Sequence, residues 1–195
     1  MTAPIFSTSY FPSIEYLQTC LQFDHIQIEK HENYPKQTLR NRCFILSPNG
    51  VQCLSVPVRH SVGKKILTRD VKISYEAAWQ QQHWRSLEAA YNRSAYFEFY
   101  KDDLEKKLFY HHHYLIDLNQ SLFLWMMQKL KHSITIQLTD TYMEKSSFQT
   151  LINKNNKAAG LFPPNQKPYP QVFASKFGFV PNLSGLDWLF NTSGI

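Results

Sequence analysis

The pattern of apolar and polar residues changes twice within the first thirty positions. Residues 5–9 form a short β-prone run that ends before Pro12. Ser13 can then cap a helix with one apolar face over 14–21, and residues 25–29 alternate between apolar and polar side chains. This pattern predicts a strand, a helix and a second strand in succession.

A tight turn at Asn49-Gly50 predicts a hairpin between strands over 42–46 and 51–56. In the register that this turn favours, the pairs are Pro48 with Val51, Leu46 with Cys53, and Cys43 with Val56. Both faces of the hairpin carry apolar side chains, which predicts a covered, central position. Because faces alternate along a strand, Cys43 and Cys53 should point to opposite sides and cannot form a disulfide.

The rest of the chain contains further strand and helix patterns. The predicted elements are a strand over 65–73, a helix from Ser74 to about Tyr91, a short helix over 102–109, a longer helix over 114–131 and a strand over 133–138. Residues 141–170 are rich in Asn, Lys, Pro and Ser and have little periodicity, so we expect a long irregular segment there. Asn182 or Ser184 can cap a short terminal helix.

Together these elements predict an α/β fold in one domain over residues 1–195. Its mixed sheet opens with the strand, helix and strand of the N-terminus, contains an antiparallel hairpin and has helices on at least one face. An α+β arrangement is the alternative. A chain of 195 residues with 43% hydrophobic and 15% aromatic residues can bury enough surface to fold, which excludes disordered and fibrous classes.

Signals for export, membrane insertion and metal binding are missing from the sequence. The longest mostly apolar stretch, 115–127, contains polar residues and is shorter than a membrane span, and the first ten residues lack the features of a secretory signal. We therefore expect a cytoplasmic protein. Cys20, Cys43 and Cys53 have no CxxC spacing and are predicted to be buried free thiols. The histidines at 111–113 would point about 100° apart on a helix, so no metal and no cofactor are expected.

Positive charge is concentrated in one segment. The formal net charge is +6, and residues 30–72 carry nine Lys or Arg against two acidic residues, a local charge of +7. Such a segment attracts anions such as nucleotides, phosphates or acidic glycans, and the alternative is an ordinary solvated surface. Nucleic acid is not favoured as the partner, because no DNA- or RNA-binding motif accompanies the basic residues.

Any active or binding site must be formed by residues that lie far apart in the sequence. The chain has no phosphate-binding glycine loop, no zinc protease motif and no nucleophile elbow of the kind found in hydrolases. His83 lies between Trp79 and Leu87 on the apolar stripe of its predicted helix. An imidazole can move a proton near neutral pH, so His83 is a candidate general base. The alternative is a core histidine bonded to a carbonyl group.

Two arginines and one tyrosine are candidates for ligand binding. Arg40 and Arg42 lie two residues apart at the start of a strand, hence on one face, where paired guanidinium groups suit a phosphate or a carboxylate. The alternative is structural pairing with Glu29, Glu32 or Asp187. Tyr10 lies in the turn over residues 7–13, where a parallel α/β sheet commonly binds ligands. Its ring is either a ligand contact or an aromatic staple.

Four motifs follow one another along the chain: YFPSIEYL at 10–17, RNRC at 40–43, HWRSL at 83–87 with AYF at 95–97, and FVPNLS at 179–184 with Asp187 beyond it. Together they resemble the WbqC-like protein family over almost the whole chain, and residues 31–43 are similar to its Bacteroidetes branch. The chain departs from the family where Ser7-Thr8 replace a Gln-Pro pair. The resemblance implies surface-polysaccharide biosynthesis of the O-antigen type, through modification of a nucleotide-linked or lipid-linked sugar.

From the residues and the resemblance we expect a group transferase that acts on a nucleotide-activated amino sugar, an anionic small molecule. The expected roles are diphosphate binding by Arg40, Arg42 and Lys36, substrate contact by Tyr10 and Asn182, and general-base catalysis by His83. The alternative is a non-catalytic module that binds an anionic ligand or a protein partner in the same pathway. The sequence does not decide the oligomeric state.

Overall fold

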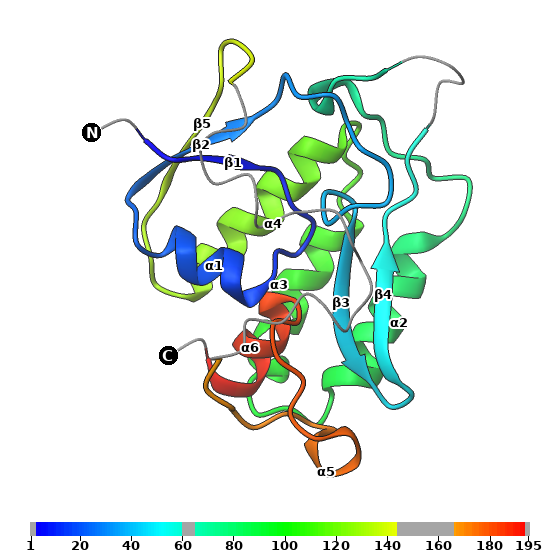
Figure 1. Cartoon of the computed structure of the whole chain (residues 1–195). Coiled ribbons are helices and arrows are strands. Elements are labelled where there is room, and N and C mark those ends of the chain that lie inside the picture. The colour runs from blue at the N-terminus through cyan, green and yellow to red at the C-terminus, as the bar shows by residue number, and fades with distance from the viewer. Residues whose placement is uncertain (1–2, 60–64, 144–165, 194–195) are drawn as a thin grey trace.

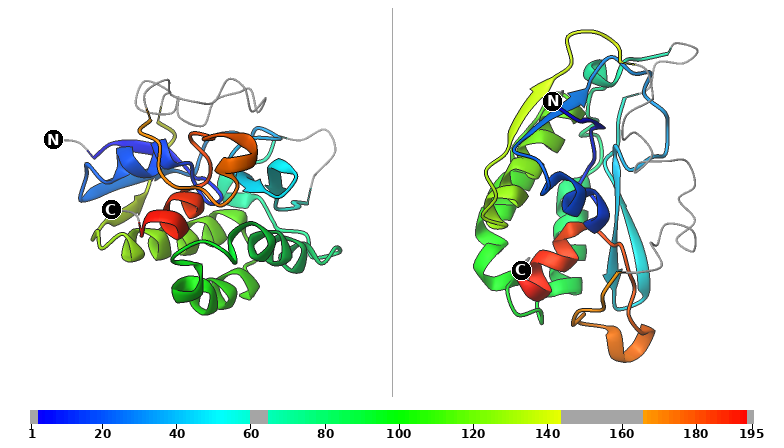
Figure 2. Two further views of the ribbon diagram at one scale, coloured as in Figure 1. Left: turned by 90° about the horizontal axis from the view of Figure 1, so that it is seen from below. Right: turned by 60° about the vertical axis from the view of Figure 1, so that its left-hand side comes forward.

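Strands and long helices lie in two layers. The computed structural model describes residues 3–59, 65–143 and 166–193 (Figure 1). Seen from below, α2 (Trp79–Tyr91), α3 (Phe97–Phe109) and α4 (Leu115–Lys129) form one layer, and the strands lie against it (Figure 2). The strands are β1 (Ile5–Ser7), β2 (His25–Glu29), β3 (Arg42–Ser47), β4 (Gly50–Ser55) and β5 (Thr135–Leu138). The shorter helices of the described ranges are α1 (Ile14–Cys20), α5 (Ala174–Phe177) and α6 (Gly185–Thr192), with a 3-10 turn at Thr68–Asp70.

One sheet is parallel throughout, with the strand order β1-β2-β5. Phe6 of β1 pairs with Ile28 of β2, and Ile26 of β2 pairs with Ile136 of β5. α1 connects β1 to β2, which confirms the strand, helix and strand predicted for the N-terminus. Phe6, Ile26 and Ile28 of this sheet belong to one core together with Phe123 of α4, and Ile136 and Leu138 of β5 pack against it.

The hairpin of β3 and β4 forms a second sheet, and its register differs from the prediction. Ser47 pairs with Gly50, so the turn consists of Pro48-Asn49 rather than Asn49-Gly50. Proline suits the first central position of an ordinary turn, and Gly50 then takes the positive φ of 103° at the position after it. The expected Asn-Gly turn would need a positive φ at Asn49 as well, which the structure does not have.

The register shift of two residues keeps every side chain of the hairpin on its predicted face. Cys43 is buried on the inner face, the side on which α2 packs, and Cys53 is exposed on the outer face. The prediction that all three thiols are buried is therefore wrong for Cys53. The exposure of Val51 and Cys53 likewise corrects the expected central position of the hairpin, because the outer face of β4 is left exposed.

Residues 65–73 do not form the predicted strand. Residues 68–70 are a 3-10 turn, and isolated bridges at Leu67 and Ile73 join the segment to two separate parts of the chain. No single partner strand runs beside the segment in the described structure. Its alternating pattern reflects local burial of Val71 and Ile73 rather than a ladder of strand pairs.

The long helices bury the predicted stripes but do not all begin where expected. α2 begins at Trp79 rather than after Ser74. α3 begins at Phe97 instead of residue 102, because the Phe97 ring packs edge-on against Phe190 of α6 with centroids 5.1 Å apart. α4 and β5 agree with the prediction to within two residues at each end.

These elements confirm the predicted α/β class, with the parallel strands and the antiparallel hairpin in separate sheets. Of the irregular segment expected over 141–170, residues 144–165 lie outside the described residues.

The C-terminal motif docks on the start of α1 and on β3. The Gly185 N–H donates to the Pro12 carbonyl at 2.7 Å, and the Ser184 N–H donates to the Phe44 carbonyl at 2.8 Å. Ser184 also caps α6, because its hydroxyl accepts the Leu186 N–H at 3.2 Å. Residues far apart in the sequence are thus joined around a buried glycine.

Replacing Gly185 with Ala is expected to lower the free energy of unfolding by about 1–3 kcal/mol. A Cβ at this position would overlap Leu17 and lie 2.8 Å from Cε of Met126, so core side chains would have to move. Urea unfolding measures the loss, with Ser175→Ala on exposed α5 as the control. An unchanged stability of the Gly185 variant would contradict this tight packing.

Candidate functional site

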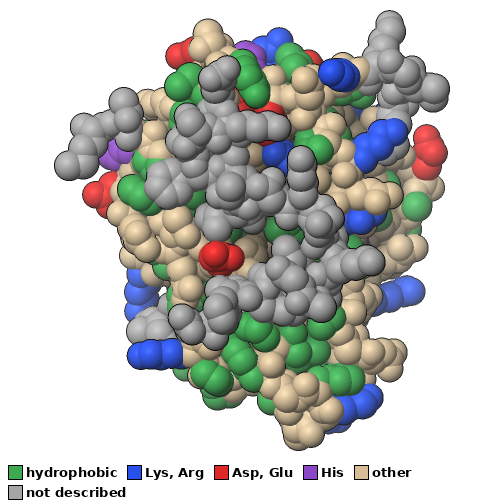
Figure 3. Space-filling model, viewed as in Figure 1, with side chains coloured by type: hydrophobic (Ala, Val, Ile, Leu, Met, Phe, Trp, Pro, Cys, Tyr) green, Lys and Arg blue, Asp and Glu red, His purple; other side chains and the backbone are tan. Residues whose placement is uncertain are grey.

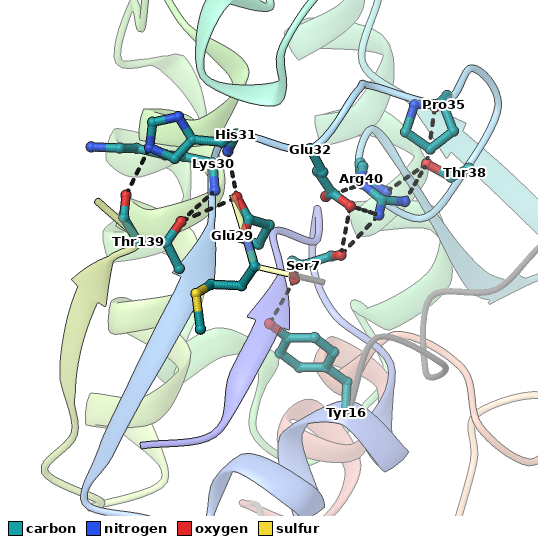
Figure 4. Close-up of polar contacts among 11 residues, drawn as sticks. Ser7, Tyr16, Glu29, Lys30, His31, Glu32, Pro35, Thr38, Arg40 and Thr139 are labelled. Carbon is teal, nitrogen blue, oxygen red and sulfur yellow. Dashed lines mark hydrogen bonds and ion pairs between the residues drawn. The ribbon is translucent and has the colours of Figure 1, made fainter. Parts of the chain in front are cut away.

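Polar side chains gather at the carboxyl ends of the parallel strands (Figure 4). Ser7 ends β1, Glu29 ends β2, and Thr139 directly follows β5, and all three are buried. Because the strands are parallel, these ends meet at one edge, which is where sheets of this type commonly bind ligands. We call this region the carboxyl edge.

Glu29 organises one half of the carboxyl edge. Its carboxylate accepts hydrogen bonds from the His31 N–H at 2.6 Å, the Thr139 hydroxyl at 3.1 Å and the Met143 N–H at 2.8 Å. The residue is fully buried, and it has no cationic partner among the described residues. Neutral donors therefore replace water around the charge, and the same bonds fix the backbone at His31 and the hydroxyl of Thr139.

Arg40 and Glu32 form a buried ion pair in the other half of the edge. Nε and Nη2 of the guanidinium donate to the two carboxylate oxygens at 2.8 and 2.7 Å. Nη2 also donates to the Ser7 hydroxyl at 2.8 Å, and Nη1 donates to Thr38 Oγ1 at 3.4 Å. Arg40 is only 7% exposed. It therefore has the structural pairing that was the alternative to phosphate binding, and its guanidinium is not free for a ligand.

His83 and Tyr10 are bonded to each other inside the core. The Tyr10 hydroxyl and His83 Nδ1 are 2.8 Å apart, and the imidazole also has a backbone hydrogen bond to Ser55. His83 is 4% exposed and Tyr10 is completely buried. Burial lowers the pKa of His83 to about 4, because a charged imidazolium would lose its solvation. This placement supports a core histidine rather than a general base, and a core ring rather than a ligand contact.

The hairpin separates His83 from Arg42. Tyr10, the partner of His83, lies close enough to Cys43 on the inner face for the thiol to affect its pKa. Arg42 precedes Cys43 and points to the outer face, where its charge partly opposes the rise that burial causes in the pKa of Cys53. The two arginines and the imidazole therefore do not converge on one hollow, because neighbouring side chains on a strand point in opposite directions.

Arg42 is a partly buried cation without an ion pair among the described residues. Its Nε is buried and has no hydrogen-bond partner among the described residues, and the same holds for the Tyr34 hydroxyl. Burial raises the pKa of Tyr34 while the guanidinium groups of Arg40 and Arg42 oppose that shift, so the ring lies near both. Lys36, two residues further along, is exposed. We call Arg42 and Tyr34 the Arg42 site.

Basic side chains are also numerous around this region. In the view of Figure 3, Lys and Arg are spread along the right-hand side, which is the side of β4 and residues 65–73 in Figure 1. Arg59, Lys65 and Lys72 are exposed, and none of them has an ion pair within the described residues. The concentration of positive charge seen in the sequence is therefore a surface feature with little internal neutralisation.

Asn182, a predicted substrate contact, is bonded to the start of α1. Its Oδ1 accepts the Glu15 N–H at 3.0 Å, and its Nδ2 donates to Glu15 Oε2 at 3.2 Å. These bonds support a structural role that joins the C-terminal motif to α1. Asp187, one of the carboxylates considered as an arginine partner, instead accepts hydrogen bonds from Tyr169 at 2.5 Å and Gln171 at 2.8 Å.

The turn between β1 and α1 covers a hollow too small for a substrate. Its volume of 10 Å³ has room for about one water molecule. Thr8, Ser9, Tyr16 and Asn119 are among the residues that line it, and Asn119 Oδ1 is buried without a hydrogen-bond partner in the described structure. Among the described residues, the turn over 7–13 therefore lines a hollow of water size.

Within residues 3–59, 65–143 and 166–193, no three His, Cys, Asp or Glu side chains are arranged to hold a metal ion. No helix in these ranges is long and apolar enough to cross a membrane. The histidines at 111–113 lie between α3 and α4 rather than on a helix, and His111 stacks on Tyr75 with ring centroids 3.7 Å apart.

Sequence reasoning missed Glu29, His31 and Tyr34 as site residues. A signal existed for Glu29 and His31, which lie at or just after the end of the strand predicted over 25–29. The carboxyl ends of parallel strands commonly bind ligands, which is also why the turn over residues 7–13 is a candidate site. No local signal marks Tyr34. Its position beside Arg42 arises only when residues 30–36 fold against the hairpin.

Acid should destabilise the protein through His83. Because the folded state lowers the pKa of His83 from 6.5 to about 4, the neutral imidazole contributes fully above pH 6.5. As pH falls towards 4 this contribution is lost, by about 3 kcal/mol in total. Urea unfolding of the wild type and His83→Gln across this range should show a stability difference that shrinks with acid. Exposed His25→Gln is the control, and a pH-independent difference for His83→Gln would contradict the buried neutral imidazole.

Replacing Arg40 with Met should cost about 3–5 kcal/mol of stability, because Glu32 is left buried without its cation. Arg42→Met in the same segment should cost less than about 1 kcal/mol, since Arg42 has no ion pair in the described structure. Thermal and urea unfolding measure both, and Arg40→Met with Glu32→Leu should recover much of the loss. Equal losses for the two single variants would contradict the structural assignment of Arg40.

Comparison with known proteins identifies the family. The model of the WbqC-like protein family matches residues 8–161. No curated protein and no solved structure matches the chain. The family match starts directly after β1 and continues past β5, so it includes Glu29 and Thr139 of the carboxyl edge, the hairpin and α2 to α4, whereas Ser7 precedes it. The chain belongs to the WbqC-like protein family.

Proposed function

We propose that this chain is a group transferase of surface-polysaccharide biosynthesis that acts on a nucleotide-activated amino sugar. Membership of the WbqC-like family supports the pathway, which is the one that the family resemblance implies. The Arg42 site supports the ligand class, because its unused donors suit a diphosphate. The anionic part of the sugar nucleotide is assigned to this site.

The observation that carries the proposal is the buried Nε–H of Arg42, which has no hydrogen-bond acceptor among the described residues. A guanidinium that is partly withdrawn from water loses solvation, and a buried Nε–H without an acceptor adds to that cost. The partly exposed guanidinium of Arg42 would donate to the phosphate oxygens. The buried Nε–H of Arg42 and the Tyr34 hydroxyl would join these contacts once the groups that cover them move. Exposed Lys36 adds positive charge nearby in the sequence. Arg40 is held by its structural bond to Glu32 and does not contact the ligand.

The burial of His83 favours a second candidate function. A transferase needs a group that accepts a proton from the attacking amine or hydroxyl, and the imidazole expected to do this is in the core. A non-catalytic module of the same pathway would need only the Arg42 site. Such a module would bind a sugar nucleotide and release it unchanged.

Arg42→Ala should weaken binding of UDP and of UDP-N-acetylglucosamine by about 10- to 100-fold, since a charge-assisted hydrogen bond is lost. Isothermal titration calorimetry measures both ligands, and binding by the wild type should also weaken with added salt. The matched control is Arg85→Ala, because Arg85 is exposed on α2 and has no ion pair within the described residues. Wild-type affinity in the Arg42 variant would rule out this binding site.

Turnover distinguishes the two candidate functions. Incubation of wild-type protein and UDP-N-acetylglucosamine with hydroxyl- and amine-bearing sugar acceptors should give a new product by mass spectrometry if the chain is a transferase. Binding without any product, under conditions where Arg42→Ala abolishes the binding, would support the module instead.

A further inference from the structure

A second group of basic residues lies at the carboxyl edge, around His31. Arg69 comes from the 3-10 turn, and its backbone N–H donates to the Lys30 carbonyl at 3.1 Å, which brings the turn beside the end of β2. Arg69 Nη1 is 3.0 Å from His31 Nδ1. The side chain of Arg69 is 44% exposed and His31 is partly exposed, so both can meet a dissolved ligand.

The bonds of His31 define its tautomer. A guanidinium can only donate, so Nδ1 must be the acceptor in the contact with Arg69. Nε2 lies 3.0 Å from the Thr139 carbonyl, which can only accept, so Nε2 carries the proton. The imidazole in this arrangement is neutral, and its lone pair at Nδ1 points to the side occupied by Arg69.

Glu29 and Thr139 hold this imidazole in place. Glu29 accepts both the His31 N–H and the Thr139 hydroxyl, and Thr139 in turn accepts His31 Nε2–H through its carbonyl (Figure 4). The ring is therefore bonded through its own backbone and through Nε2, and only Nδ1 faces an exposed, movable partner. A site built on fixed groups of this kind loses little entropy when a ligand binds.

The charges around His31 favour an anion. Arg69 and Lys30 are positive, and Asp70 is 3.6 Å from Arg69 Nε in an exposed ion pair. Such exposed pairs are weak, so Asp70 offsets only part of the attraction. Buried Glu29 already has hydrogen-bond donors on both of its oxygens.

We propose that His31 and Arg69 bind inorganic hydrogen phosphate. The P–OH group donates to His31 Nδ1, and the charged oxygens accept from Arg69, which turns its Nη1 from the imidazole to the ligand. The P–OH group thus takes the place of Arg69 as the donor to His31 Nδ1, and the phosphate oxygens add charge-assisted hydrogen bonds with Arg69. This site is separate from the Arg42 site and does not depend on the proposed transferase function.

The lone pair at Nδ1 makes the site selective for a protonated anion. Sulfate has the charge and shape of hydrogen phosphate but no proton to donate, so it would leave Nδ1 without a donor once Arg69 has turned. Methyl phosphate near pH 7.5 is mostly a dianion without a P–OH group and should resemble sulfate. The site therefore favours free phosphate over a phosphate monoester.

Calorimetric titration near pH 7.5 with phosphate, sulfate and methyl phosphate tests the proposal. Wild-type protein and Arg42→Ala should both bind phosphate about tenfold more tightly than the other two anions. Use of the Arg42 variant keeps this result independent of the Arg42 site. Arg69→Ala should weaken every anion, whereas His31→Ala should remove the preference for phosphate and leave the three anions equal.

Arg85→Ala serves as the matched control for loss of one exposed cation and should bind phosphate as the wild type does. Equal affinity for phosphate and sulfate in the Arg42 variant, or a preference for phosphate that persists in His31→Ala, would overturn the proposal. Absence of phosphate binding in the Arg42 variant would overturn it as well. Circular dichroism of each variant verifies that the fold is intact before titration.

Discussion

The buried ion pair between Glu32 and Arg40 joins the two sheets of this protein. Glu32 follows β2 of the parallel sheet and Arg40 precedes β3 of the hairpin, and Ser7 at the end of β1 bonds to the same guanidinium. α4 is tied to this point by Asn119, whose amide donates to the Arg40 carbonyl at 2.8 Å. Both charges are withdrawn from water, so each is stabilised only when it is paired with the other in a defined geometry. This pairing fixes the position of Arg40 and, with it, the start of β3.

The fixed start of β3 determines what each face of the hairpin can do. Cys43 faces inward, towards the core that holds Tyr10 and His83, so the inner face has a neutral imidazole with its bonds complete. Arg42 faces outward and has an unused donor. His83 and Arg42, which the sequence suggested as parts of one site, thus lie on opposite faces of one sheet, and the outer face is the one for which anion binding is proposed.

The cations of this chain differ in what they can bind because their partners differ. Arg40 is saturated by a carboxylate and two hydroxyl groups, whereas Arg42 has no anion in the described structure and Arg69 has only a weak, exposed one. Net charge alone does not distinguish them. An arginine can bind a ligand when folding leaves some of its N–H donors without an acceptor. Which donors are left depends on contacts between segments that are far apart in the sequence.

The sequence by itself determined the α/β class, the first strand, helix and strand, and the buried stripe of α4, because the period of apolar residues records which side of an element is covered. It did not determine the hairpin register, which Pro48 shifts, or the start of α3, which Phe190 fixes from the far end of the chain. It also suggested residue types that could form a site, two arginines and an imidazole. Only the tertiary structure decided that Arg40 is neutralised, that His83 is buried and that Arg42 keeps a free donor, because a side chain's charge partners and exposure come from residues that the local sequence does not contain.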